Sequence, residues 1–160
     1  MNARGFTLLE LLVVLVVLSI ATGLVVVRGT PSDGNLLLSE AQRLSQILRI
    51  AQQDAILKSR DIRFHANDQG FRFEELANNT WRPLEGEPML RPRNWNHTPV
   101  RVELQLEGRQ VPFLTLEPQT RLELKQVRLV RNATGVMLES RNGGLYRTGQ
   151  PQVLVVQGAR

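Results

Sequence analysis

Residues 4–28 read RGFTLLELLVVLVVLSIATGLVVVR and contain the longest apolar run of the chain. From residue 6 to residue 27, 17 of 22 residues are apolar, and Glu10 is the one charged side chain. A helix rises about 1.5 Å per residue, so this segment forms a rod of roughly 33 Å, enough to cross the hydrocarbon core of a bilayer. We therefore expect a membrane-spanning helix at the amino terminus. Arg4 and Arg28 flank this helix on both sides, so the distribution of positive charge barely indicates which of its ends faces the cytoplasm.

Glu10 is the informative residue of this run. A carboxylate inside a spanning helix costs about 2.5–3.5 kcal/mol on insertion scales, so it needs a partner and marks a functional position. A hydrated glutamate near the helix end is the plainer interpretation. A cleavable secretory signal is another alternative, because residues 19–21 resemble a cleavage site, but Glu10 would interrupt its apolar region.

The composition is that of a folding chain of 160 residues, with 42% hydrophobic and 22% charged residues. Its length allows one ordinary domain, or one small domain with an appendage. The absence of cysteine excludes disulfides, thiolate metal sites and a cysteine nucleophile. The formal net charge is +5, and arginine supplies 18 of the 20 basic residues. This charge permits an acidic partner without demonstrating one.

A second, amphipathic helix is predicted after residues 29–34, where two glycines and a proline interrupt the first. Asp33 or Asn35 is expected to cap it, and it should end near Lys58. Apolar residues recur at spacings of three and four, as on one helix face: Leu37, Ala41, Leu44, Leu48, Ala51 and Ala55. We expect this face to pack on the core of the domain.

Beyond residue 60 the apolar period changes to two, as in strands. The pattern predicts a hairpin at 62–73, a third strand at 81–84, a clear strand at 100–107 that Gly108 turns back towards 111–116, and short strands near 136–138, 145–147 and 153–156. A change of parity between Leu124 and Val127 predicts a bulge or bend near Lys125-Gln126. The fold class is therefore α+β, with a long hydrophobic helix plus an amphipathic helix packed on an antiparallel β-sheet or β-sandwich.

The segment 83–99 contains four prolines and no strand period. Arg91, Arg93 and Trp95 are of the residue types enriched at interface hot spots, so a partner loop is one interpretation. Phosphate contact with base stacking is another, and a packed connection is the third.

No catalytic motif, phosphate loop or histidine pair at metal spacing occurs in the sequence. His65 and His97 are expected to be surface histidines. We therefore expect no enzymatic activity, no catalytic residue, no metal and no cofactor.

The stretch Arg4-Gly5-Phe6-Thr7-Leu8-Leu9-Glu10, with the apolar run after it, resembles the class III signal of type IV pilins and type II secretion pseudopilins. The resemblance implies that a prepilin peptidase cuts after Gly5 and methylates the new amino terminus at Phe6. It also implies that Phe6 and Glu10 mediate assembly, the carboxylate meeting the terminal amine of a neighbouring subunit.

Residues 40–57 and 80–84 resemble the H-type minor pseudopilins of type II secretion. The chain lacks the carboxyl-terminal cysteine pair of many type IV pilins and the acidic calcium loop of major pseudopilins. The implied organisation is a leader at 1–5, a transmembrane and assembly helix at 6–28, a break with the amphipathic helix at 29–59, and a periplasmic β-rich domain at 60–160.

The resemblance further implies an inner-membrane protein that enters a short pseudopilus near its tip. Its implied partners are other minor pseudopilins, the major pseudopilin and the prepilin peptidase, with the secreted substrate or the outer-membrane secretin as further partners. The alternative is a minor type IV pilin that acts in pilus assembly or DNA uptake. Because the arginines are dispersed among acidic residues, nucleic acid is not an expected partner.

Overall fold

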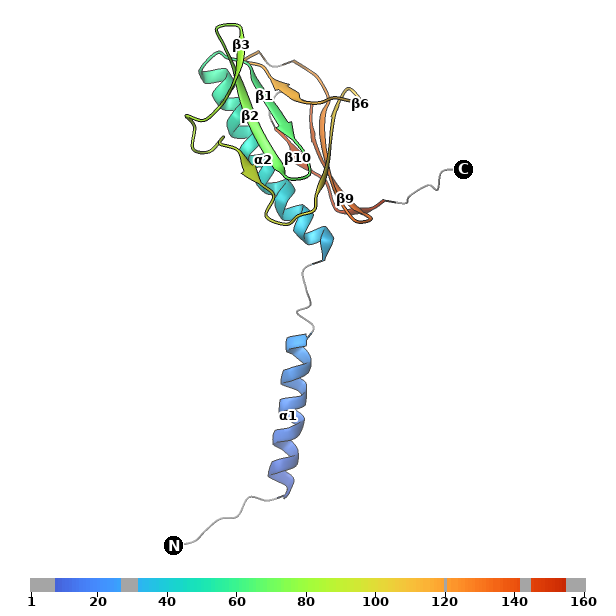
Figure 1. The fold of residues 1–160 in the computed structure, drawn as a ribbon. Coiled ribbons are helices and arrows are strands. Elements are labelled where there is room, and N and C mark those ends of the chain that lie inside the picture. Colours follow the sequence, from blue (N-terminus) through green and yellow to red (C-terminus); the bar gives the residue numbers. More distant parts are fainter. Residues whose placement is uncertain (1–7, 27–31, 120, 142–144, 155–160) are drawn as a thin grey trace, which may run out of the picture. The chain divides into compact units, whose positions relative to one another are not determined.

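The structure is a computed structural model that describes residues 8–26, 32–119, 121–141 and 145–154. The chain divides into two compact units, Met1–Pro31 and Ser32–Arg160. The first contains helix α1 (Leu8–Val26), and the second contains helix α2 (Asp33–Leu57) and all the described strands (Figure 1). A helix therefore lies within each of the two segments that the apolar patterns predict to be helical, and the full span expected at 6–28 is not tested.

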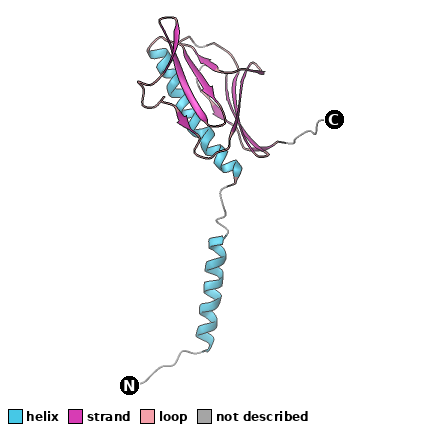
Figure 2. Ribbon diagram, in the orientation of Figure 1, coloured by secondary structure: helices cyan, strands magenta, loops and turns pink. Residues whose placement is uncertain are grey.

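The strands of the second unit alternate with short turns. They are β1 (Ile62–Ala66), β2 (Gly70–Ala77), β3 (Thr80–Pro83), β4 (Arg93–Asn94), β5 (Arg101–Leu106), β6 (Arg109–Gln110), β7 (Leu114–Leu116), β8 (Lys125–Arg131), β9 (Thr134–Ser140), β10 (Arg147–Thr148) and β11 (Gln152–Val153). Figure 2 shows that one long helix accompanies these strands.

The N-cap of α2 lies one residue before Asp33, the first of the two expected caps. Ser32 is the N-cap, and its hydroxyl accepts a hydrogen bond from the backbone N–H of Asn35. The serine has extended backbone angles, as an N-cap requires. Asp33 instead lies in the first turn, where its negative charge favours the helix dipole. The prediction that Asp33 or Asn35 caps the helix is therefore wrong.

The apolar face of α2 forms the centre of the core. The six residues that the helical spacing predicts are all buried, together with Ile47, Glu40 and Gln52. The helix packs against β8, β9 and β10 and also against β1 and β7, so strands of both sheets contact it. Because a buried leucine contributes about 1.5–3 kcal/mol, this face is a main source of the stability of the unit.

The first sheet has the strand order β3-β2-β1-β7, with β4 pairing with β2. The predicted hairpin is confirmed, because β1 and β2 pair in antiparallel register with Phe64 opposite Phe73. Ile62, Phe64 and Phe73 face the core, whereas Arg63 and His65 take the other parity and lie on the outer face.

The second sheet has the order β10-β9-β8-β5-β6, with β11 pairing with β9. Strands β5 and β8 pair without interruption, Arg101 opposite Val130 and Leu106 opposite Lys125. The predicted bulge near Lys125-Gln126 is therefore wrong, whereas the alternative of a bend there stays a prediction. The parity changes because β8 begins at Lys125, so Leu122 precedes the strand and is exposed.

Residues 109–116 connect the two sheets. Strand β6 turns back onto β5, as Gly108 predicts, but β7 leaves that sheet and pairs with β1, Ile62 opposite Leu116. Lys125 of β8 reaches across, and its Nζ donates a hydrogen bond of 2.5 Å to the carbonyl oxygen of Thr115. Burial lowers the pKa of Lys125 below its ordinary value of 10.5. This buried cation thus joins β8, the central strand of the second sheet, to β7 at the edge of the first.

Candidate functional site

The amino-terminal motif lies at the edge of the described residues. Gly5 and Phe6, the expected processing positions, lie outside them. Glu10 lies in the first turn of α1, where a carboxylate interacts favourably with the helix dipole. Large apolar side chains surround it on the helix, and those from Leu8 to Leu18 are between 46% and 85% exposed within this unit. Contiguous exposed apolar surface of this kind marks contact with protein or lipid.

Among the helices of the described residues, none combines the length and the apolar content needed to traverse a bilayer. The spanning segment expected at 6–28 extends past the described part of α1 at both ends, and it stays a prediction.

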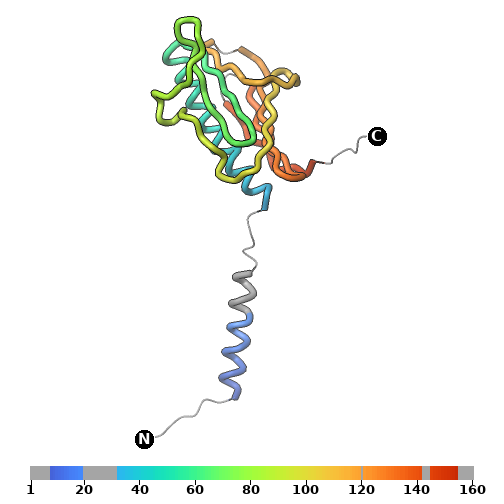
Figure 3. The backbone as a smooth tube through the Cα atoms, in the orientation of Figure 1, coloured from blue at the N-terminus to red at the C-terminus, as the bar shows by residue number. Residues whose placement is uncertain are grey.

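The segment 83–99 runs back along β2, passes the end of the β1–β2 hairpin and enters β5 (Figure 3). Its middle forms strand β4, in which Arg93 pairs with Phe71 and Asn94 with Gly70. The Arg93 side chain is partly buried, and its Nη2 donates to the carbonyl oxygen of Pro88. Arg91 is exposed. The segment is therefore a packed connection over much of its length.

Trp95 is a core residue, which fits the interpretation of the segment as a packed connection and not the interpretation of Trp95 as a surface hot spot. Its side chain is 4% exposed, and its ring lies 5.2 Å from the ring of Phe71. The indole Nε1–H donates a hydrogen bond of 2.8 Å to the carbonyl oxygen of Asn67. Burial leaves the indole no open face for a partner. Of the three residues predicted for this loop, Arg91 is the exposed one.

Glu40 is a buried carboxylate on α2 that sequence reasoning missed. Its side chain is 1% exposed, and Arg43 donates to Oε2 at 2.6 Å and 3.2 Å. Oε1 accepts from the backbone N–H of Asn96, and His97 Nδ1 lies 3.5 Å away. The helical spacing could have indicated its burial, because residue 40 is three residues after Leu37 and four before Leu44 and so lies on the same face of the helix.

The carboxyl end of α2 carries an ion-pair network. Asp54 pairs with Lys58 and Arg60, and these two cations also pair with Glu87 and Glu75. Burial would raise the pKa of Asp54, but the hydrogen bonds and charges of Arg60 and Lys58 outweigh it and hold that pKa below 3.8. The network joins the helix end to β2 and to segment 83–99, so its arrangement is structural.

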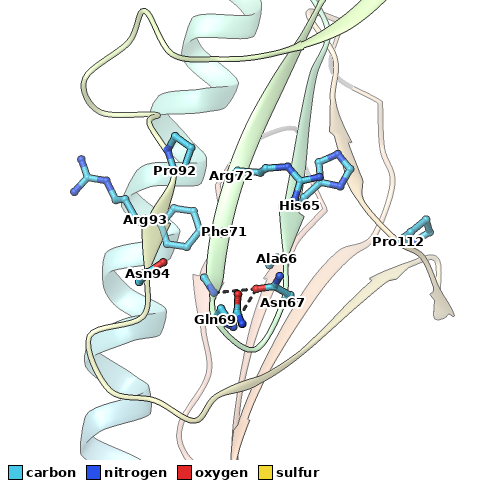
Figure 4. Close-up of a pocket in the computed structure, with 11 residues that line it drawn as sticks. His65, Ala66, Asn67, Gln69, Phe71, Arg72, Pro92, Arg93, Asn94 and Pro112 are labelled. Atoms are coloured by element: carbon cyan, nitrogen blue, oxygen red, sulfur yellow. Dashed lines mark hydrogen bonds between the residues drawn. The ribbon is translucent and has the colours of Figure 1, made fainter.

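A hollow of about 250 Å³ lies at the turn of the β1–β2 hairpin (Figure 4). In the turn, Asn67 Oδ1 accepts hydrogen bonds from the backbone N–H groups of Gln69 and Gly70. Arg72 and His65 lie on one side of the hollow, and Arg93 lies on the other (Figure 4). Polar and basic side chains share this lining with Ala66, Phe71, Pro92 and Pro112, and none of the described lining residues is a carboxylate.

The two histidines occupy different surroundings. His65 is partly buried on the outer face of the first sheet, 2.9 Å from Glu74 Oε2, and His97 is exposed. Within the described ranges, no group of three or more histidine, aspartate or glutamate side chains is placed to hold a metal ion.

Comparison with known proteins gives two matches. The prokaryotic N-terminal methylation motif matches residues 1–26. Type II secretion system protein H of Pseudomonas aeruginosa is 35% identical to this chain, over 51% of this chain and 49% of the relative. The chain thus aligns with about half the length of the curated relative that it matches. No solved structure matches it.

These findings agree with the order of elements in the structure. The matched motif contains the apolar helix α1, and a second helix packed on antiparallel sheets follows it. The chain therefore carries the amino-terminal motif and the order of elements typical of type IV pilin-like proteins, and it resembles type II secretion system protein H over about half its length.

Proposed function

We propose that this chain is a minor pseudopilin, a structural subunit of the type II secretion pseudopilus that helps to export folded proteins across the outer membrane. One combination of findings carries the proposal: the methylation motif matches residues 1–26, and the chain is 35% identical to type II secretion system protein H over 86 residues. The proposed role is structural and requires neither catalysis nor a cofactor.

The proposed assembly step depends on two charges. A prepilin peptidase cuts after Gly5 and methylates the amine of Phe6, and that amine meets Glu10 of an adjacent subunit. Charges of opposite sign attract strongly where water is excluded, whereas either charge alone is penalised there. The pairing therefore favours a bundle of helices in register over a single helix in lipid.

The exposed apolar side chains of α1 support an anchor in the inner membrane, with the β-rich unit in the periplasm. Before assembly this surface faces lipid, and after extraction it faces neighbouring helices. The partners proposed for this step are other minor pseudopilins and the major pseudopilin. Placement near the pseudopilus tip, and contact with the secreted substrate or the secretin, belong to the same proposal.

The test is the replacement Glu10→Leu in cells that depend on this chain for secretion. We expect the variant to be processed and inserted in the membrane but to enter the pseudopilus at least tenfold less often, measured by shearing and immunoblotting. The matched control is Glu85→Leu, which changes an exposed carboxylate of the β-rich unit. Normal incorporation and normal secretion of the Glu10 variant would overturn the proposal.

A further inference from the structure

Arg63 lies between two aromatic rings on the outer face of the first sheet. Its guanidinium carbon is 3.7 Å from the ring centre of Trp81 and 4.2 Å from that of Phe113. Trp81 comes from β3, and Phe113 directly precedes β7, so opposite edges of the sheet hold this side chain. Arginine stacks well on aromatic faces, and the two rings cover both faces of the guanidinium.

The charge of Arg63 is not neutralised by the nearest carboxylate. Glu74 is its partner in the register of β1 and β2. However, Glu74 Oε2 lies 2.9 Å from His65 Nε2, and Oε1 accepts from Arg72 Nε at 3.3 Å. Among the described residues, no carboxylate forms an ion pair with Arg63, and its Nε is buried without a hydrogen-bond partner.

The rings restrict the guanidinium before any ligand arrives. An arginine side chain ordinarily loses much rotamer freedom when it is fixed in a complex, and here folding has already fixed it. With the guanidinium against two rings and its Nε buried, the terminal Nη1 and Nη2 remain, and their paired N–H donors match the two oxygens of a carboxylate. We propose that Arg63, held by Trp81 and Phe113, is a docking point for a carboxylate side chain of a protein partner.

The surroundings favour a protein carboxylate over a nucleic acid. Duplex DNA binding needs several phosphate contacts, whereas a single guanidinium held against two rings offers one contact to an anion. Trp81, Phe113 and Leu76 are all partly exposed and add apolar contact area around the cation. A cation with an aromatic rim suits a single acidic side chain flanked by apolar residues. The inference does not depend on the proposed function.

The test uses the full chain in detergent micelles and two blocked peptides, Gly-Phe-Glu-Phe-Gly and its glutamine counterpart. Isotope-edited NMR of the Arg63 Nε–H and the Trp81 indole gives the site and the dissociation constant. We expect the glutamate peptide to bind about tenfold more tightly than the glutamine peptide. Arg63→Gln should remove this preference. Arg63→Lys keeps the positive charge but lacks the paired N–H donors of the guanidinium, so it should retain only part of the preference for the glutamate peptide.

The matched control is Arg109→Gln, which removes an exposed arginine of β6. It should leave the preference unchanged. Equal binding of the two peptides, or an equal loss in the Arg109 variant, would overturn the inference. Tighter, Arg63-dependent binding of a twelve-base-pair DNA duplex would also overturn it, in favour of a nucleic-acid site. The Arg63→Lys variant keeps the test decisive if Arg63→Gln does not fold.

Discussion

The buried carboxylate of Glu40 accepts a hydrogen bond of 2.8 Å from the backbone N–H of Asn96, which lies 56 residues further along the chain. Through this contact, helix α2 holds the proline-rich segment 83–99 near the carboxyl-terminal end of that segment. Trp95, the residue before Asn96, is buried beside it. The segment that sequence composition marks as a loop is therefore fastened to the core from two sides.

Replacing Glu40 tests this attachment. Glu40→Ala removes an acceptor from the Asn96 N–H and a partner from Arg43, so we expect the free energy of unfolding to fall by about 2–3 kcal/mol. Glu40→Gln keeps one acceptor oxygen and should lose less. Chemical denaturation of the full chain in detergent measures both. Glu85→Ala, at an exposed position of the same segment, should change stability by less than about 0.5 kcal/mol.

Trp95 gives a second prediction. Trp95→Ala empties a core position and should cost about 3–5 kcal/mol. Trp95→Phe keeps a ring against Phe71 but loses the hydrogen bond to Asn67, so we expect a smaller loss of about 1–2 kcal/mol. Thermal unfolding gives both values. A Trp95→Ala protein as stable as the parent would mean that the indole is not in the core.

Gly70 lies where β2 and β4 approach most closely. A Cβ at this position would overlap the carbonyl oxygen of Arg93, a backbone atom that cannot move without disturbing the pairing. We expect Gly70→Ala to lower the unfolding free energy by about 1–3 kcal/mol and to increase hydrogen exchange at the backbone N–H of Trp95. Gly86→Ala is the control, because a Cβ there meets open space. Equal effects of the two replacements would contradict the close approach.

Asp54 predicts a dependence of stability on pH. Its pKa is lower in the folded chain than the ordinary 3.8, so its ion pairs stabilise the fold above that value, and the contribution is lost as the pH falls through the folded pKa. Asp54→Asn should therefore cost about 1 kcal/mol at neutral pH and nothing in strong acid. Denaturation at a series of pH values measures the difference. A constant difference at every pH would refute it, and Asp68→Asn, in the exposed hairpin turn, supplies the baseline.

Processing gives a prediction for the amino terminus. If the residue before the cut must be glycine, Gly5→Leu leaves the chain unprocessed, five residues longer and without a methylated amine at Phe6. Mass spectrometry of membrane fractions distinguishes the two forms. Ala3→Leu, two residues earlier in the leader, should still be processed. A mature chain that begins at Thr22 in the parent protein would instead favour a secretory signal.

Much of the fold is predictable because it follows from local periodicity. The spacing of Leu37, Leu44 and Leu48 predicts the buried face of α2, and the alternation around Phe64 and Phe73 predicts the hairpin. These patterns report burial directly, so a single sequence suffices to find them.

The errors arise where a long-range contact determines the environment. Trp95 is of a residue type enriched at interface hot spots, but the hairpin turn supplies its hydrogen-bond partner, and the indole packs in the core. The parity change before Val127 reflects a strand that begins late, not a bulge, because register with β5 sets that start. The Arg63 stack depends on Trp81 and Phe113 meeting across a sheet, which no local pattern reveals.

The pairing of β7 with β1 also affects the order in which the protein can be made. Strand β1 leaves the ribosome long before residues 114–116, yet one of its edges stays open until they emerge. The first sheet therefore cannot be completed before β5 and β6 of the second sheet have been made, because the chain must pass through them to reach β7, and β8 to β11 follow later still. The unit matures as a whole late in synthesis, and a nascent chain that ends before Leu114 exposes an adhesive strand edge.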